Sequence, residues 1–384
     1  MSEFNTLLTG WRRHLHAHPE LALQETNTAA FVAEKLREMG IEVTENVGKT
    51  GVVGTLKMGD GGRTIGLRAD MDAITLQEKN TFDYRSDTDG VMHGCGHDGH
   101  TTSLLGAAKL LSESRNLNGI VRFIFQPGEE PGKGARAMIE DGLLERFPMD
   151  EIYGLHNGPQ ITGGRLETCV GGCCSSEDNF KIVIRGRGSH ASQPHLSIDP
   201  LVIASQIILA LQTIVSRNSD PLQTAVVSCT ELFTDGGHNA IPGTVTILGD
   251  ARSYTSEIQK LIEQRMRAIC KGICDANGAD CTVEYTHEFA PTVNWAECVA
   301  TMAKAAGKVL GESNVDDNAR PISGSEDFGL FLRYIPGCFA FYGTGKKDIV
   351  DFVPLHNPHY DYNDEYLETA AKLYVEIAKT ALEK

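Results

Sequence analysis

Residues 92–102 read MHGCGHDGHTT and hold the densest group of reactive side chains in the chain. Cys95 and His97 are one residue apart, and the glycines around them allow the backbone to bend tightly. Thiolate and imidazole are common ligands of zinc-type metals. The stretch therefore admits three interpretations: one corner of a metal site, a reactive cysteine, or a glycine-rich turn whose polar residues face water.

A pair of adjacent glutamates, Glu129 and Glu130, lies in QPGEEPGKG at 126–134. The pair directly follows an apolar run and is bracketed by two Pro-Gly pairs, so the turn directs the two carboxylates differently. One carboxylate can then bind a metal while its neighbour accepts a proton from water. Ordinary solvated charge is the alternative for such a pair.

Further histidines could complete a metal site. His156 closes the apolar run of YGLHNGP, and His356 lies in the proline-punctuated loop VPLHNPHYDYND. A lone histidine is more often structural than functional. We interpret three N-terminal histidines as structural and two others as bystanders near a helix start; these are His14, His16, His18, His93 and His100.

An alternation of strands and helices positions these residues. Apolar runs predict strands over Thr64–Ala69, Ile120–Gln126 and Ile152–His156, with helices over Thr101–Ser112 and Gly134–Asp141. Such an order is typical of an α/β domain around a mostly parallel sheet. Ligands of these domains bind at the carboxyl ends of the strands. Asp70 and Asp72, the glutamate pair and His156 are therefore expected at one sheet edge.

A second region, residues 178–290, changes character and predicts an inserted domain. The expected elements follow the β-α-β-β-α-β order of a ferredoxin-like fold: Phe180–Arg185, Asp199–Ser216, Ala225–Leu232, Thr244–Arg252, Glu257–Ala276 and Cys281–His287. Residues 1–177 and 291–384 would form the discontinuous catalytic domain. Its other expected elements are Ala22–Met39, Ile41–Val47, Val52–Lys57, Trp295–Leu310, Cys338–Tyr342 and Asp364–Leu382.

The bulk composition describes a folded globule and excludes some partners. Hydrophobic residues make up 41% of the chain, charged residues 22%, and the formal net charge is −16. This charge argues against nucleic acid or an anionic membrane surface as a partner. We find no apolar run near the roughly 18–20 residues that span a bilayer. The first residues lack the layout of a signal peptide, so we expect a cytoplasmic protein whose ten cysteines are reduced.

A set of ordered motifs carries a family resemblance across nearly the whole chain. The motifs are RRHLHAHPE, LRADMDA at 67–73, MHGCGHDGHT, QPGEE, GSHASQPH at 188–195, HNAIPG at 238–243, GSEDF at 324–328 and HNPHYDYND at 356–364. The chain resembles the hippurate hydrolase, aminoacylase and indole-acetyl-amino-acid hydrolase group of dinuclear metallo-amidohydrolases. These belong to a wider clan of co-catalytic zinc aminoacylases and carboxypeptidases.

The resemblance implies two divalent metal ions per subunit. The matching ligand positions are Cys95, His97, Glu130, His156 and His356. His97 and His156 would serve one ion, Glu130 and His356 the other, and Cys95 would bridge them or bind one. Mixed ligands of this kind tolerate zinc, manganese, cobalt or nickel.

The resemblance also assigns roles beside the metals. Glu129 matches the general base, and Asp72 matches an aspartate that orients a metal ligand. In the inserted dimerisation or lid domain, His190 matches a histidine that reaches the partner subunit's active site. Asn239 and Arg252 match residues that grip the substrate. A homodimer or homotetramer is therefore expected.

Two features depart from the wider clan. Asp70 occupies the position of the clan's first histidine ligand, as in this subgroup generally. Cys173 and Cys174 lie near the domain hinge, where small or apolar residues are usual. These thiols either line the pocket or are small buried residues.

The function implied is hydrolysis of the amide bond of small N-acyl amino acids by metal-activated water. A dipeptidase or exopeptidase on the same scaffold would use identical chemistry. A non-catalytic binding protein and a redox protein built on Cys173 and Cys174 are the alternatives from other classes. The sequence leaves the acyl group, the amino-acid side chain and the native metal open.

Overall fold

The computed structural model describes residues 2–115, 117–346 and 352–384, and it divides the chain into two compact units. Unit 1 consists of Met1–Cys173, Val293–Pro321 and Glu326–Lys384. Unit 2 consists of Cys174–Thr292 and Ile322–Ser325. The short return segment Ile322–Ser325 joins unit 2 although it lies far along the chain from the rest of that unit. Each unit is described by itself.

Unit 1 is built on an eight-stranded sheet with the order β1-β2-β6-β3-β7-β18-β8-β17. The strands are β1 Glu42–Val47, β2 Gly51–Met58, β3 Thr64–Asp70, β6 Gly119–Gln126, β7 Glu151–Thr162, β8 Leu166–Glu167, β17 Val315–Asp316 and β18 Gly337–Gly345. The central strands β6, β3, β7 and β18 pair in parallel, while β1, β2 and β6 pair antiparallel. The predicted α/β fold with a mixed, mostly parallel sheet is confirmed.

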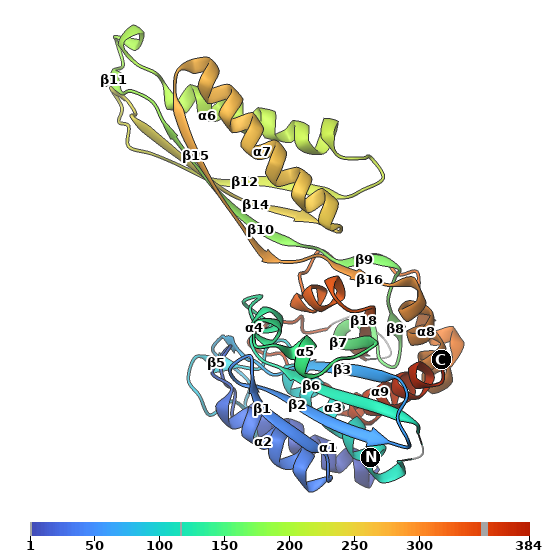
Figure 1. Ribbon diagram of the computed structural model, residues 1–384. Helices are drawn as coiled ribbons and strands as arrows, with labels where there is room; N and C mark the ends of the chain where they lie inside the picture. The colour runs from blue at the N-terminus through green and yellow to red at the C-terminus, as the bar shows by residue number, and fades with distance from the viewer. Residues whose placement is uncertain (1, 116, 347–351) are drawn as a thin grey trace. The chain divides into compact units, whose positions relative to one another are not determined.

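Helices of unit 1 pack their apolar faces against this sheet (Figure 1). The main helices are α1 Glu3–Ala17, α2 Thr26–Glu38, α3 His97–Ser114, α4 Gly134–Glu140, α5 Leu143–Arg146, α8 Ala296–Leu310 and α9 Leu367–Leu382. One continuous core joins side chains of α2, α3, α8 and α9 to those of β2, β3, β6, β7 and β18. Burial of this apolar surface holds the sheet rigid beneath the loops at its carboxyl edge.

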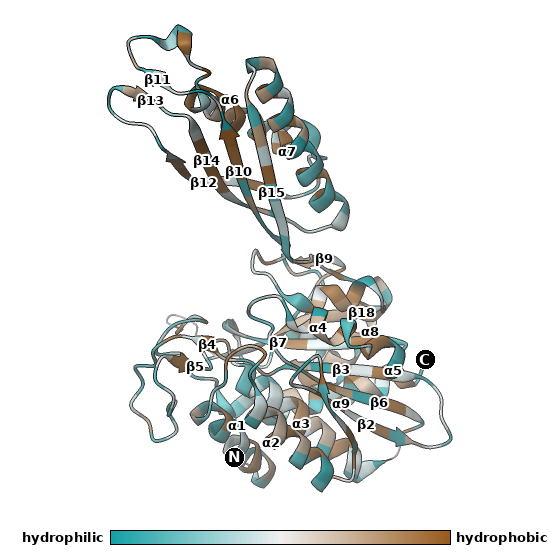
Figure 2. Cartoon of the chain, turned by 60° about the vertical axis from the view of Figure 1, so that its left-hand side comes forward, coloured by the Kyte–Doolittle hydropathy of each residue, from teal (hydrophilic) through white to brown (hydrophobic). Residues whose placement is uncertain are grey.

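Unit 2 has the predicted β-α-β-β-α-β order. Its elements are β10 Glu177–Arg185, α6 Pro200–Thr213, β12 Ala225–Thr234, β14 Thr244–Ser253, α7 Ser256–Asn277 and β15 Asp280–Phe289. All pairs in the sheet order β12-β14-β10-β15 are antiparallel. The hydrophobic colouring of β10, β12 and β14 in Figure 2 marks the strands that face the apolar sides of α6 and α7 in the core.

The helix predicted over Ala22–Met39 corresponds to α2 Thr26–Glu38 but begins four residues too early. The preceding helix α1 Glu3–Ala17 and the turn before α2 were not predicted. Leu23 takes a φ of 61°, a left-handed conformation that an α-helix cannot contain. The periodic apolar residues around it gave no sign of this turn.

The expectation that no apolar segment is long enough to span a bilayer is wrong. Among the described helices, Pro200–Asn218 (α6 with the following turn η2, Ile214–Asn218) is long and apolar enough by length and composition alone. Core helices of globular proteins meet the same criterion. Ile203, Ile207 and Leu211 of this helix are buried in the core of unit 2, which accounts for part of its apolar character.

Candidate metal centre

The five predicted metal ligands lie together in unit 1. Cys95 precedes α3, His97 is the first residue of that helix, Glu130 follows β6, His156 lies in β7, and His356 lies in the segment 352–363. Cys95 Sγ is 3.5 Å from His156 Nε2, and His356 Nε2 is 3.3 Å from Glu130 Oε1. His97 Nε2 is 3.9 Å from the same Glu130 oxygen. The loops at the sheet edge therefore gather thiol, imidazole and carboxylate donors from distant parts of the chain.

The geometry of these atoms fits divalent cations. Donor atoms bound to one tetrahedral zinc-type ion at its usual bond lengths are about 3.3–3.7 Å apart. The separations of 3.3 Å and 3.5 Å match this value. His97 Nε2 is buried and has no hydrogen-bond partner within the described structure. Buried polar atoms are rarely left in this state unless an ion or water completes them.

Hydrogen bonds preset two of the imidazoles as ligands. His156 Nδ1 donates to the backbone carbonyl of Asn157 at 2.8 Å, which leaves the Nε2 lone pair for a cation. His97 Nδ1 donates to Asp72 Oδ1 at 3.3 Å, which likewise leaves Nε2 available. A carboxylate behind a metal-binding histidine fixes the ring and raises its basicity.

Asp72 also holds the loop that carries the two glutamates. Its Oδ1 accepts from the backbone N–H of Glu129 and its Oδ2 from that of Glu130, both at 3.0 Å. The side chain is almost completely buried. One carboxylate thus connects His97 to both glutamates, so the relative position of the three residues depends on Asp72.

The backbone conformation of Gly96 allows Cys95 and His97 to face the same site. Gly96 has a φ of 93°, and a Cβ there would lie 2.6 Å from Asn157 Oδ1. A side chain would therefore suffer both backbone strain and a collision. The left-handed turn at Gly96 leads directly into α3 and places the thiol and the first imidazole of the helix side by side.

His356 comes from the other end of the chain and is more exposed than the other ligand candidates. Its side chain is 54% exposed, and its backbone N–H donates to the carbonyl of Gly94 at 2.8 Å. This bond ties the segment of His356 to the loop of Cys95. The hydrogen bond to Glu130 raises the pKa of His356 and outweighs the opposing effect of burial.

The electrostatic environment separates the roles of the acidic groups. Burial raises the pKa of the Cys95 thiol, and the nearby Glu130 carboxylate raises it further. Burial also raises the pKa of Glu129 well above its usual range, helped by Glu326 and Asp327. The pKa of Glu130 is lowered despite its burial, because His356 and His97 favour its ionised form.

Asp70 is engaged by other residues and lies near the cluster. Its oxygens contact Arg68 Nη1 at 2.8 Å and His100 Nδ1 at 2.6 Å, and His97 Nε2 is 3.8 Å away. His100 also bonds Asn157, so both of its ring nitrogens have partners. Burial opposes ionisation of Asp70, but His97, Arg68 and His100 lower its pKa. His100 therefore acts as a buried support between β3 and β7.

Two details differ from the sequence predictions. His156 does not end its strand, because β7 continues to Thr162 and His156 pairs with Phe341 of β18. The apolar run ended at His156, but backbone pairing with β18 extends the strand beyond it. The full burial of His93, which was expected to be a bystander near the helix start, was not predicted either, and this burial lowers its pKa to about 4.

The predicted catalytic residue His190 and the predicted substrate-binding residues Asn239 and Arg252 belong to unit 2. His190 in β11 (Ser189–His190) and Asn239 lie beside each other, because His190 pairs with Ala240 of β13 (Ala240–Ile241). Both side chains are exposed. Arg252 in β14 already bonds Asp250, Glu177 and Ser325 within the unit. Cys173 and Cys174 are both buried in β9 (Gly171–Cys174).

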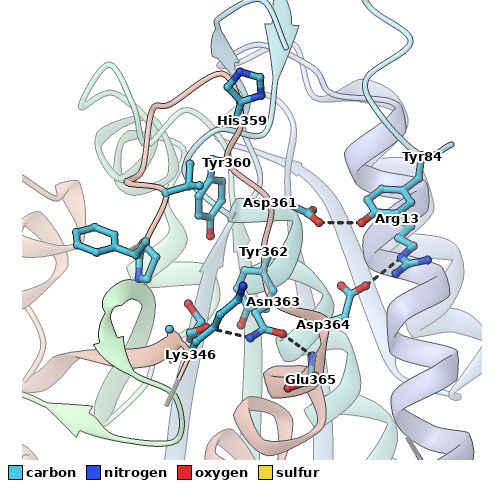
Figure 3. A pocket seen from close by; sticks show the side chains of 15 residues that line it. Arg13, Tyr84, Lys346, His359, Tyr360, Asp361, Tyr362, Asn363, Asp364 and Glu365 are labelled. Carbon is cyan, nitrogen blue, oxygen red and sulfur yellow. Dashed lines mark hydrogen bonds and ion pairs between the residues drawn. The ribbon is translucent and has the colours of Figure 1, made fainter. Parts of the chain in front are cut away.

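A separate cavity of 730 Å³ lies beside the segment that carries His356 (Figure 3). Its described lining includes Arg13, Tyr84 and Tyr360 but none of the five ligand candidates. Arg13 donates to Asp364, and Tyr84 donates to Asp361, as the dashed lines show. Because none of the ligand candidates is among its described lining residues, the cavity is distinct from the candidate metal centre.

Comparison with known proteins places this arrangement in a family of metallohydrolases. The family described as Peptidase family M20/M25/M40 matches residues 66–380, so the chain belongs to this family. The resemblance drawn from the sequence motifs is confirmed.

Relatives match over almost their whole length. The chain is 44% identical to "Hippurate hydrolase" of Campylobacter jejuni, covering 96% of this chain and 94% of the relative. It is 40% identical to "N-acetyl-L-cysteine deacetylase" of Bacillus subtilis, covering 100% and 90%. The crystal structure of the Bacillus subtilis YXEP protein, described as a dinuclear metal binding peptidase from M20 family, matches with a TM-score of 0.85. That protein is 34% identical, and 99% of each chain is covered.

Proposed function

We propose that this protein is a metal-dependent amidohydrolase that cleaves the amide bond of N-acyl amino acids. This proposal rests mainly on the position of the buried Glu129 next to the ligand candidates. Glu129, Glu130 and His97 place donor atoms within 4.8 Å of one another. The two curated relatives described above, a hippurate hydrolase and a deacetylase, support this substrate class. The hydrolase class expected from the sequence agrees with the family.

Two divalent cations are the proposed cofactors, with zinc, manganese, cobalt and nickel as candidates. His97 and His156 would hold one ion, and Glu130 and His356 the other. Cys95 belongs to both groups of donor atoms, Cys95–His97–His156 and Cys95–Glu130–His356, so its thiolate would be available to either ion. When bound, such ions lower the pKa of water and polarise an amide carbonyl.

Glu129 is the proposed general base. Its buried carboxylate has a raised pKa, which suits a group that takes a proton from water and returns it to the leaving amine. Asp72 holds the backbone of Glu129 and thereby fixes where that carboxylate stands.

His190, Asn239 and Arg252 are the proposed substrate contacts of unit 2. The backbone N–H of Ser192 donates to His190 Nδ1 at 3.2 Å, so the neutral ring carries its proton on Nε2. That N–H is a suitable donor to a developing oxyanion, a role often worth about 3–4 kcal/mol. Arg252 would grip the substrate carboxylate in exchange for part of its present ion pairing.

The decisive experiment is a substrate panel with the cation-free protein reconstituted separately with each metal. The proposal expects metal-dependent release of amine from N-acetyl and N-benzoyl amino acids. Faster cleavage of dipeptides would favour the exopeptidase alternative, to which the name of the YXEP protein points. Failure to bind any of the four cations would favour a non-catalytic binding protein and overturn the proposal.

We also propose a homodimer, or a tetramer built from it, formed through unit 2. The α6 helix exposes Leu201, Val202 and Leu209, the last being 73% exposed, although the helix lies in a domain with its own core. Apolar surface of this kind is typical of an interface between subunits. A cytoplasmic location is proposed as well, because buried thiols outside any disulfide, such as Cys95, Cys270 and Cys298, are expected in a reducing compartment.

A further inference from the structure

The loop that carries Glu129 is held through its backbone by three buried carboxylates from three distant segments. Asp72 accepts from the N–H groups of Glu129 and Glu130, as described above. Asp327 Oδ2 accepts from the N–H of Ala135 at 2.9 Å. The third carboxylate, Glu25, accepts from the N–H of Gly128 at 2.8 Å. Asp72 was predicted from the sequence; the other two were not.

Glu25 is completely buried and uses both of its oxygens. Oε1 accepts from the backbone N–H of Leu23 at 2.9 Å as well as from Gly128, and Oε2 accepts from the hydroxyl of Thr50. Burial raises the pKa of Glu25. A buried carboxylate is costly unless hydrogen bonds compensate it. Glu25 is nevertheless placed where its bonds join α2 to the loop of the general base.

The two chain segments that Glu25 joins are both in unusual conformations. Leu23 has a φ of 61° and Gly128 a φ of 56°, and a Cβ on Gly128 would lie 3.0 Å from the Leu23 side chain. A left-handed non-glycine residue such as Leu23 costs free energy unless its surroundings hold it. The shared Glu25 oxygen holds both turns against each other, immediately before Glu129.

Hydrogen bonds within the loop transmit this placement. The N–H groups of Lys133 and Gly134 donate to the carbonyl of Gly128, and the N–H of Gly132 donates to the carbonyl of Glu129. The turn is therefore a compact unit held by its own backbone hydrogen bonds. A shift of Gly128 would move the Glu129 carboxylate relative to the cations and the water.

We propose that Glu25 is a positioning residue for the general base: it fixes the turn at Gly128 and thereby the direction of the Glu129 carboxylate. This inference rests on the proposed function. Glu25 touches neither the ligand candidates nor the substrate in the proposed mechanism. Its contribution is expected in kcat rather than in metal binding or KM.

Glu25→Gln and Glu25→Ala test this role, with Glu20→Ala as the matched control. The glutamine retains an oxygen that accepts from Leu23 and Gly128, and the Thr50 hydroxyl can rotate to accept from its amide, whereas alanine removes all three bonds. Glu20 also accepts from two backbone N–H groups, those of Asn27 and Thr28, but within the described residues its side chain has no hydrogen bond to residues 127–134.

The expected result for Glu25→Ala is a fall in kcat of about 100-fold, the scale reported for a misplacement near 1 Å, with KM within about threefold of wild type. Bound metal, measured by atomic emission, stays at the wild-type ratio. Hydrogen–deuterium exchange of the cation-free protein speeds up in the peptide spanning residues 127–134. Glu25→Gln recovers most of kcat, while Glu20→Ala retains wild-type kcat even if its melting temperature falls.

Three outcomes would overturn the inference: unchanged kcat in Glu25→Ala, an equal loss in Glu20→Ala, or unchanged exchange in residues 127–134. Exchange is measured without substrate, so it reports on the hydrogen bonds between Glu25 and the loop even if the proposed activity is wrong. A wild-type protein that cleaves no member of the substrate panel would instead refute the proposed function. Faster exchange in Glu25→Ala would then still establish the structural half of the inference.

Discussion

Two adjacent residues of the same type show how environment assigns a role at the scale of single side chains. Glu129 and Glu130 share one turn, yet burial among Glu326 and Asp327 raises the pKa of Glu129. The pKa of Glu130 is lowered, because its bond to His356 outweighs burial. A carboxylate with a raised pKa suits proton transfer, and one held ionised suits a cation.

The first prediction contrasts these neighbours. Glu129→Gln should retain its metal and lose activity by at least about 100–10,000-fold, the range for removal of a general base. Glu130→Gln should lose cations, because the amide is a weaker ligand than the carboxylate. Metal analysis and initial rates on the same preparations check both. Glu140→Gln, at an exposed position in α4, is the control for charge removal. Substantial activity in Glu129→Gln would refute its assignment as base.

The second prediction concerns Cys95. Burial and Glu130 raise the pKa of this thiol, so the cysteine is a neutral group until a cation binds it. Cys95→Ala should lower metal affinity by at least about tenfold, because even the loss of a residue that hydrogen-bonds to a metal ligand costs this much. The rate of hydrolysis should fall with the metal affinity. Calorimetric titration of the cation-free protein measures the affinity. Cys229→Ala, in unit 2, should bind metal as wild type does; equal affinities in both variants would exclude Cys95 as a ligand.

The third prediction is a pH dependence of stability that arises from His16. Burial lowers the pKa of this histidine, but hydrogen bonds to Asp98 and Glu78 outweigh burial and raise it to about 9. The pKa of His16 in the folded protein exceeds its value in the unfolded chain, near 6.5. The stabilisation from the protonated ring is therefore complete below pH ~6.5 and is lost as the pH rises through about 9. This stabilisation amounts to no more than about 3 kcal/mol.

Denaturant unfolding of the cation-free protein between pH 6 and 9 measures this contribution. His16→Gln should flatten the decline, since glutamine does not titrate in this range. His18→Gln changes an exposed histidine just beyond α1 and should leave the decline unchanged. A decline that persists in His16→Gln would assign it to another group.

At the scale of elements, strands were predicted better than the turns that complete the site. Buried runs such as Thr64–Ala69 and Ile120–Gln126 match β3 and β6 within one residue, because apolar sequence and strand burial coincide. The turn around Leu23 was missed, because a left-handed leucine carries no sequence signal. Motif order identified the ligand candidates without geometry. Glu25 escaped notice because its partner is a backbone N–H, which any residue supplies.

The fourth prediction tests the turn into α3. Gly96→Ala should destabilise the protein by more than about 1 kcal/mol and lower metal affinity, because strain and the collision with Asn157 both displace Cys95 and His97. Gly90→Ala is the control: its φ is 73°, but its side chain would meet nothing within 4 Å. Denaturant unfolding should show a smaller cost for Gly90→Ala, with wild-type metal affinity. Equal metal affinity in the two variants would contradict the proposed role of this turn.

At the scale of the whole molecule, the fifth prediction concerns assembly. Leu209→Glu places a charge on the exposed apolar face of α6 and should shift a dimer towards monomer. Val170→Glu adds the same charge at an exposed position in unit 1 and should not. Sedimentation velocity at several concentrations distinguishes these results. A monomeric wild-type protein would refute the proposed dimer, and an unshifted Leu209→Glu would place its interface elsewhere.

The hydrogen bond from His356 to Gly94 has a consequence for the order of folding. It joins residues that lie far apart in the sequence, and the five ligand candidates come from four separate segments of the chain. Contacts so distant in sequence form slowly, because the entropy cost of closing a long loop precedes the stabilisation that the contacts provide. Partly folded chains therefore lack a complete cation site, and cations that bind only the finished fold add their binding energy to its stability. Cation uptake should thus be among the last events of refolding, later than formation of the parallel sheet.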